Sequence, residues 1–193
     1  MLNQIVVRTS NILALDDDEL FRLCAANQNL RIERDADGNL IFMAPTGGET
    51  SSRNSEINTE LALWNRKTGL GKVFDSNGGF VVPNGAMRAP DASWIPMTQW
   101  EQLSQEQRKH FLPLCPDFVI ELRSPSDRLT DVQEKMEEWM ANGCQLGWLI
   151  DPVEEQAFVY RLSASPTRVV GFENELAGEE VLPGFVLDLA ILM

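Results

Sequence analysis

The chain has very little histidine and cysteine, and it has no long apolar run. Its one histidine, His110, excludes a metal site built from several histidines. The three cysteines, Cys24, Cys115 and Cys144, are far apart and odd in number, so they form neither a zinc-binding pattern nor an obvious set of disulfides. This usage favours a reducing compartment, and we expect the cytoplasm. No stretch reaches the ~18 consecutive apolar residues of a transmembrane helix, so we expect no membrane span.

Positive charge is also scarce. The 193 residues include 16 Lys and Arg against 29 Asp and Glu, which gives a formal net charge of −13 at pH 7. Because phosphate neutralisation supplies much of the affinity of nucleic-acid binders, this balance counts against tight non-specific binding. A local basic patch, or acids that a metal ion neutralises, would still allow DNA binding. The length suits one core, and we expect residues 1–193 to form a single domain.

Apolar periodicity and turn residues predict a chain of mixed helices and strands. We expect helices over 16–28, 53–69 and 128–142, the last two ending at Gly69 and Asn142-Gly143. A hairpin is expected around Asp37-Gly38, followed by a loop over 46–52. Short strands are expected within 71–96 and over 117–123, 145–152, 155–162, 167–172 and 179–185, with one or two helical turns within 97–111. This order favours an α+β or mixed α/β domain with a central sheet.

The stretch PDFVIELRSPSD, residues 116–127, places an acid inside an apolar strand. Asp117 and Glu121 share a face, but about 13 Å of strand separates them, which is too far for one ion. Asp91, in APDASWIP, is the partner that the sequence offers. If strands 91–95 and 117–122 are neighbours, the two acids could meet, because opposite residues of adjacent strands approach within about 4.5–5.5 Å. Two carboxylates that close need a cation between them, and oxygen ligands favour Mg²⁺ or Mn²⁺. The backbone carbonyl of Leu122 is the expected third ligand.

Hydrolysis of a phosphodiester also needs a positive group near the attacking water or the phosphate. Arg123 lies on the face of Glu121 but stays protonated, whereas Lys135 can lose a proton when desolvated. The helix over 128–142 has an apolar stripe, and at about 100° per residue Lys135 falls at the edge of that stripe. We therefore expect Lys135 to reach over the sheet toward Glu121 from the helix. Arg123 then occupies the position in the strand that such a lysine would otherwise take. The stripe consists of Leu129, Val132, Met136, Trp139 and Met140.

At these residues the chain resembles the PD-(D/E)xK nuclease superfamily and, more narrowly, the Uma2 family of restriction-endonuclease-like proteins. The resemblance covers roughly residues 15–165 and rests on APDASW, PDFVIELRSPSD, LTDVQEKMEEWMANG and QLGWLIDP, with ERDADGNLIFM and RNSEINTELALWN also fitting. It implies a restriction-endonuclease-like fold with an N-terminal hairpin, and a magnesium-dependent nuclease acting on DNA. It assigns Asp91 and Glu121 as metal ligands, Lys135 as the relocated basic residue, and Glu56 as a supporting acid. The sequence departs from the superfamily pattern by having Glu-Leu-Arg where ExK is usual.

Other interpretations fit the same residues. Glu121 could be a salt-bridge partner, Asp91 a strand-start residue, and Glu56 an ordinary exposed helix acid. Lys135 could pair with acids of its own helix, and Arg123 could form a structural ion pair. Two alternative functions remain: a binding or interaction module without catalysis, and a metal-dependent hydrolase of small phosphate esters. If the chain cuts both strands of DNA with one site each, a two-fold dimer is expected.

Overall fold

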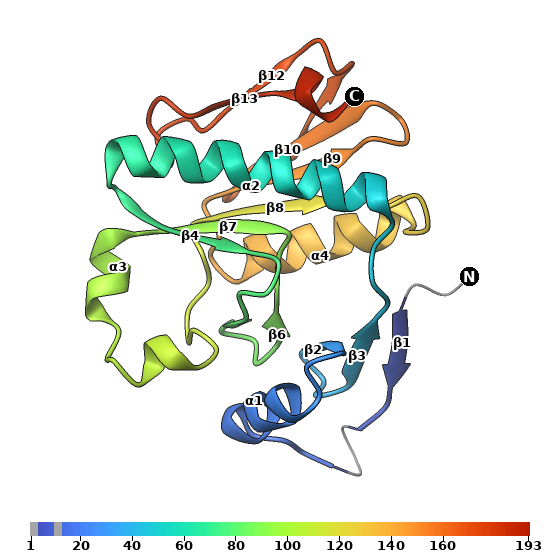
Figure 1. Ribbon diagram of the computed structural model, residues 1–193, viewed down its shortest axis with the longest axis vertical. Helices are drawn as coiled ribbons and strands as arrows, with labels where there is room; N and C mark the ends of the chain where they lie inside the picture. The colour runs from blue at the N-terminus through green and yellow to red at the C-terminus, as the bar shows by residue number, and fades with distance from the viewer. Residues whose placement is uncertain (1–3, 10–12) are drawn as a thin grey trace.

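A six-stranded mixed sheet holds Glu121 and Leu122 of the predicted site, and Asp91 and Arg123 directly flank two of its strands (Figure 1). The computed structural model describes residues 4–9 and 13–193, so residues 1–3 and 10–12 of the expected domain lie outside it. The strand order is β11-β10-β9-β8-β7-β4, with β8 and β9 parallel and the other neighbours antiparallel. The strands are β4 (Gly71–Asp75), β7 (Ala92–Pro96), β8 (Phe118–Leu122), β9 (Leu146–Asp151), β10 (Gln156–Arg161) and β11 (Thr167–Val170). The predicted mixed α and β class is confirmed.

Two helices cover opposite faces of this sheet (Figure 1). Alternate residues of β8, such as Ile120, pack with Ile57 of helix α2 (Gly48–Thr68). The intervening Val119 packs with Met136 of helix α4 (Leu129–Ala141). All five residues of β8 are therefore buried, including Glu121. The predicted stripe of α4 is confirmed, because its members belong to this second cluster.

Helix α4 lies over Glu121 because of the sheet topology. Parallel neighbours cannot be joined by a tight turn, so β8 and β9 need a crossover connection, and α4 supplies it. The helix ends where the sequence predicted: Asn142 is the C-cap and Gly143 has a φ of +103°, a conformation that glycine adopts without strain. The crossover thus carries the lysine of α4 to the strand that holds the acid.

A five-stranded sheet of order β1-β3-β2-β6-β5 lies beside the first (Figure 1). Its strands are β1 (Gln4–Val7), β2 (Arg31–Arg34), β3 (Leu40–Met43), β5 (Phe80–Val81) and β6 (Met87–Arg88). The predicted hairpin joins β2 to β3, and Gly38 in its turn has a φ of +87°. Helix α1 (Asp17–Ala26) begins with a capping box of Asp16 and Glu19, and it buries Leu20 against this sheet.

Two local predictions are wrong. Residues 46–52 were expected to be a loop, but α2 already begins at Gly48, because Gly47 has the extended conformation of an N-cap and its carbonyl accepts from the Ser51 amide at 3.0 Å. Residues 179–185 were expected to be a strand, but they form the connection between β12 (Glu175–Ala177) and β13 (Val186–Asp188). Hydrogen bonds across the connection, such as Gly178 N–H to the Phe185 carbonyl at 2.8 Å, stabilise it.

The remaining elements are short. The helical turns expected within 97–111 are α3 (Met97–Gln102) and a 3-10 turn, η1 (Gln107–Lys109), and a second 3-10 turn, η2 (Leu189–Leu192), ends the chain. All three cysteines are free thiols. Within the described ranges, no helix is both long and apolar enough to cross a membrane.

Candidate active site

Asp91 and Glu121 lie across from each other at the ends of two neighbouring strands. The antiparallel pairing of β7 and β8 ends with Ala92 opposite Ile120, and Asp91 and Glu121 are the next residues on the two chains, so they lie beside each other at the end of the ladder. Both residues are buried, with 9% and 5% of their surface exposed. The adjacency predicted from the alternation of β8 is therefore present in the structure.

The Asp91 carboxylate is held by groups from three elements. Its Oδ2 accepts the Leu122 backbone N–H at 2.8 Å. Its Oδ1 has weaker contacts, with Asn54 Nδ2 at 3.3 Å and Arg31 Nη2 at 4.0 Å. Asn58, one turn after Asn54 on α2, donates to the Asp91 backbone carbonyl at 3.0 Å. One carboxylate oxygen is thus fixed by the sheet, and the other has only long contacts with protein groups.

The Glu121 carboxylate faces two residues of α4. Lys135 Nζ lies 3.0 Å from Oε1 and 3.2 Å from Oε2. The Trp139 indole N–H, one turn further along α4, donates to Oε1 at 2.8 Å. The lysine therefore does not pair with acids of its own helix: Asp131 pairs with Arg128, and Glu138 pairs with Arg88. Its position is the one predicted from the apolar stripe, and its catalytic role stays a prediction.

A third buried acid, Glu33 of β2, completes the cluster, and the sequence analysis missed it. Only 2% of Glu33 is exposed. Its Oε1 lies 3.2 Å from Lys135 Nζ and accepts the Ala89 N–H at 3.1 Å, while its Oε2 lies 3.2 Å from Arg88 Nη1. Arg88 continues to Glu138 at 2.6 Å. The one available signal was the charged run Arg31, Glu33 and Arg34 inside a strand, whose burial no local pattern reveals.

Burial and neighbouring charges shift the ionisation of this cluster. Burial raises the pKa of Glu121, the Lys135 ammonium lowers it, and the Asp91 and Glu33 carboxylates raise it again, so that the pKa is about 7. Burial alone would raise the pKa of Glu33, but Lys135, Arg88, the Ala89 amide and Arg31 together lower it. The environment thus shifts the pKa values of the two carboxylates in opposite directions, up for Glu121 and down for Glu33.

Lys135 keeps its proton in this environment. Burial favours the neutral amine, but the Glu121 and Glu33 carboxylates favour the ammonium more, and the pKa of Lys135 is raised. Desolvation alone would favour the neutral amine that a base requires, but the two carboxylates outweigh it here. The ammonium is suited instead to stabilising negative charge.

Two residues expected to support the site lie elsewhere. Arg123 does not reach the acids; its Nη1 lies 3.0 and 2.9 Å from the two oxygens of Asp151, which is fully buried. This is the structural ion pair that the sequence left open. Glu56 is exposed, because it projects from the side of α2 about 160° away from Asn54, at about 100° per residue. Asn54 and Asn58 therefore take the position beside Asp91 that Glu56 was expected to occupy.

The donor set fits a divalent ion. Carboxylate oxygens of Asp91 and Glu121 are hard ligands of the kind that Mg²⁺ and Mn²⁺ prefer. The Asp91 charge also raises the pKa of Glu121, and a cation between the two carboxylates would relieve this repulsion. The Leu122 backbone borders Asp91, since its N–H contacts that carboxylate. Among the described residues no group of three or more His, Cys, Asp or Glu side chains has a metal-binding arrangement, so further ligands would be backbone or water oxygens.

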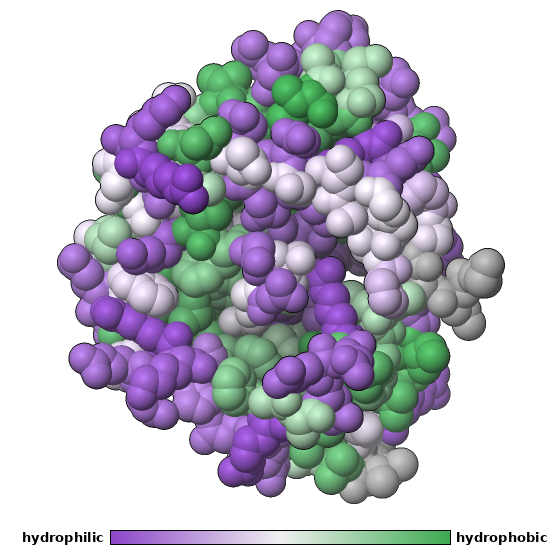
Figure 2. Space-filling model, viewed as in Figure 1, coloured by the Kyte–Doolittle hydropathy of each residue, from purple (hydrophilic) through white to green (hydrophobic). Residues whose placement is uncertain are grey.

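A cleft leads to Asp91 along α2. It has a volume of about 600 Å³, and Asn54, Asn58 and Arg31, which contact Asp91, all line it. Arg66 and Leu63 line it further along α2. The space-filling view shows a hollow below α2 with a largely hydrophilic rim (Figure 2). Three residues that contact Asp91 thus line an open groove, which also contains a second arginine, Arg66.

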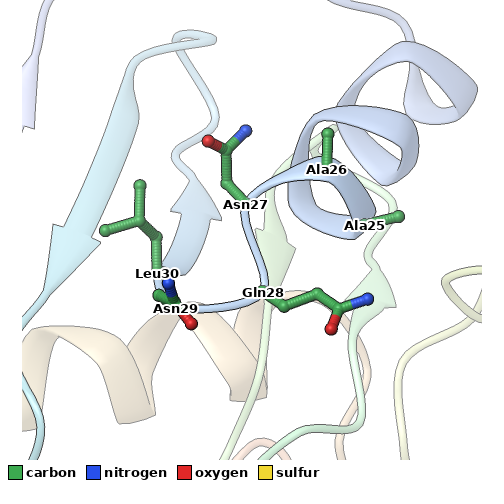
Figure 3. A pocket seen from close by; sticks show the side chains of 6 residues that line it. All are labelled: Ala25, Ala26, Asn27, Gln28, Asn29 and Leu30. Carbon is green, nitrogen blue, oxygen red and sulfur yellow. The ribbon is translucent and has the colours of Figure 1, made fainter.

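A second hollow carries no such chemistry. It has a volume of about 490 Å³ and is formed by the turn that follows α1 (Figure 3). Its lining residues are Ala25, Ala26, Asn27, Gln28, Asn29 and Leu30, none of which is ionisable. We therefore assign the site to the cleft at Asp91.

Comparison with known proteins agrees with this assignment of fold. The sheet, its two covering helices and the acids at the end of β8 define a restriction-endonuclease-like protein. The structure is similar to the crystal structure of "a putative nuclease belonging to DUF820" from Anabaena variabilis ATCC 29413, with a TM-score of 0.75 and 20% sequence identity. The match covers 92% of this chain and 97% of that chain. The chain belongs to the Uma2 family, described as "Putative restriction endonuclease", whose model matches residues 17–190. No curated protein matches the chain.

Proposed function

We propose that the protein is a metal-dependent endonuclease that hydrolyses phosphodiester bonds in DNA. One observation carries the proposal: two buried carboxylates from neighbouring strands, Asp91 and Glu121, interact electrostatically, and the ammonium of Lys135 contacts Glu121. Residues that contact Asp91 line a cleft. Membership of a restriction-endonuclease family, and the likeness to a protein described as a nuclease, support nuclease chemistry.

Asp91 and Glu121 would hold Mg²⁺ or Mn²⁺, with the Leu122 carbonyl as a further ligand. When bound, such an ion makes a water more acidic and neutralises charge on the phosphoryl oxygens. Lys135 would place its ammonium where negative charge develops on the phosphate, which is the role that its raised pKa allows. Glu33 would keep that ammonium in place through its 3.2 Å contact.

The cleft offers a path for the DNA strand in a protein that is acidic elsewhere. Arg31 and Arg66 line it, and arginine binds phosphate with a planar fork of donors. Two copies of the chain would be needed to cut both strands with one site each, and we propose a two-fold homodimer. Light scattering that gives a monomer mass at micromolar concentration would overturn the dimer.

The direct test is cleavage of supercoiled plasmid and of labelled duplex with Mg²⁺ or Mn²⁺, with Glu121→Gln as the inactive variant. Nicking by the wild type alone, abolished by EDTA, is the expected result. Cleavage by Glu121→Gln at the wild-type rate would exclude the proposed site.

One observation favours an alternative, a DNA-binding module without catalysis. The acids already have protein partners: the Leu122 N–H contacts Asp91, and Lys135 faces both oxygens of Glu121. If no divalent ion or nucleic acid tested gives cleavage, while duplex DNA still binds, this alternative becomes the better account.

A further inference from the structure

Lys135 occupies the side of Glu121 that a metal ion would approach. Its Nζ lies 3.0 Å from Oε1 and 3.2 Å from Oε2, so it faces both oxygens of the carboxylate. A divalent ion bound to the same carboxylate would stand within a few ångströms of the ammonium, and like charges at that distance repel strongly. The lysine and the ion therefore compete for Glu121.

The lysine has a second acceptor within reach. Its Nζ already lies 3.2 Å from Glu33 Oε1 and 3.5 Å from the Ala89 carbonyl. It can thus withdraw from Glu121 and keep a carboxylate and a carbonyl as partners. Burying an ammonium without such partners would be strongly unfavourable.

We propose that the divalent ion displaces Lys135 from Glu121, and that Glu33 holds the displaced ammonium. The inference rests on the metal site proposed above. Glu33 is a positioning residue in this exchange, since it contacts the lysine and neither ion nor substrate. Its own position is fixed by the Ala89 N–H at 3.1 Å and by Arg88 at 3.2 Å.

The charges of the cluster favour an exchange over expulsion of the lysine. In their charged forms, four carboxylates (Asp91, Glu121, Glu33 and Glu138) face three cations (Lys135, Arg88 and Arg31). The cluster thus carries one excess negative charge without the ion and one excess positive charge with it. Neither state is far from neutral, so the ammonium can stay inside the site.

The test is a double-mutant cycle on Mn²⁺ binding, measured by calorimetry and requiring no cleavage. Lys135→Gln removes the competitor and should tighten Mn²⁺ binding about tenfold or more, since charged hydrogen bonds contribute about 1.5–3 kcal/mol. Glu33→Gln removes the second acceptor and should weaken binding about three- to tenfold. In the double variant the Glu33→Gln effect should disappear, because no lysine remains to be held.

A matched control separates exchange from the general loss of one negative charge. Glu138→Gln removes a charge from the same network, but Glu138 contacts Arg88 and not Lys135. Its effect on Mn²⁺ affinity should be the same with and without Lys135. The proposed exchange is wrong if the effect of Glu33→Gln on Mn²⁺ affinity is also the same with and without Lys135. It is equally wrong if Lys135→Gln binds Mn²⁺ no tighter than the wild type.

Folding and function are monitored separately. Urea unfolding confirms that each variant is folded. If Lys135→Gln does not fold, Lys135→Met replaces it. Lys135→Met should also tighten Mn²⁺ binding. If the wild type binds no Mn²⁺, the proposed metal-dependent function fails. If the wild type binds Mn²⁺ and the cycle is additive, that function stands and only the exchange fails.

Discussion

Arg123 and Asp151 form an ion pair between the ends of two parallel strands, with Arg123 Nη1 at 2.9 Å from Oδ2 of a fully buried carboxylate. Asp151 also accepts from the Gln156 amide at 2.9 Å and from the Val153 N–H at 3.1 Å. The arginine that replaces the usual strand lysine is thus committed to the sheet. It is not available to a phosphate.

We therefore expect Arg123→Ala to act on stability. Removing the arginine leaves the Asp151 charge buried without its cation, which typically costs about 3–5 kcal/mol. Urea unfolding would show a lower midpoint, whereas Arg128→Ala, at a pair whose arginine is 80% exposed, should leave the midpoint nearly unchanged. Unchanged stability with weakened DNA binding would restore Arg123 as a substrate contact.

Lys135→Gln should remove turnover while DNA binding persists. If the ammonium stabilises charge that develops on the phosphate, its loss should lower kcat about 10²- to 10³-fold. Single-turnover cleavage of a labelled duplex, with binding measured by anisotropy, tests this. A variant that cuts at the wild-type rate would show that Lys135 is only a structural partner of the acids. Unlike a surface lysine, Lys135 also supports the fold, so unfolding must be measured beside activity.

Asp91→Asn should weaken Mn²⁺ binding by about tenfold or more, because it removes one ligand charge and leaves an amide nitrogen facing the ion. Calorimetric titration is the measurement, and Glu134→Gln, an exposed acid of α4 near the site, is the control for net charge. Equal affinities for Asp91→Asn and the wild type would place the ion elsewhere.

The pKa of Glu121 predicts a pH dependence of stability in the absence of metal. Burial raises this pKa from the ordinary 4.5 to about 7, so between these values the folded state binds a proton that the unfolded state has lost. The contribution is fully present below about pH 4.5 and disappears as pH rises toward 7, with an upper size of about 3 kcal/mol at about 1.4 kcal/mol per pH unit.

Thermal unfolding in EDTA from pH 4 to 8 provides the measurement. The difference in stability between the wild type and Glu121→Gln at each pH gives the contribution of Glu121 alone. It excludes the contribution of Glu33, whose lowered pKa acts in the opposite direction and at lower pH. If the difference between the two proteins does not change with pH, Glu121 has an ordinary pKa.

Local patterns predicted part of the site. The stripe of α4 placed Lys135 toward Glu121, because this depends only on helix periodicity. Alternation along β8 gave the face of Glu121, whereas its approach to Asp91 also required that β7 and β8 be neighbours, which the structure shows. The periodicity of α2 did not determine which flank faces the acids. Glu56 lies on one flank of the Ile57–Leu61 stripe, and Asn54 and Asn58 lie on the other.

Glu33 and Arg88 could not be predicted in this way. Each lies in a short strand whose charged residues resemble ordinary surface positions. Their burial results from the second sheet packing against α4, an arrangement between distant parts of the chain. No pattern within either strand records that packing.

The contact between Glu33 and Lys135 joins residues 102 positions apart in the chain. During synthesis, a growing chain that has not yet reached residue 135, in the middle of α4, leaves the Glu33 carboxylate without that partner. Closing so long a loop also carries an entropic cost that must be met before the contact forms, which makes this part of the structure a late event in folding. The charged cluster can therefore be complete only after α4 has been synthesised.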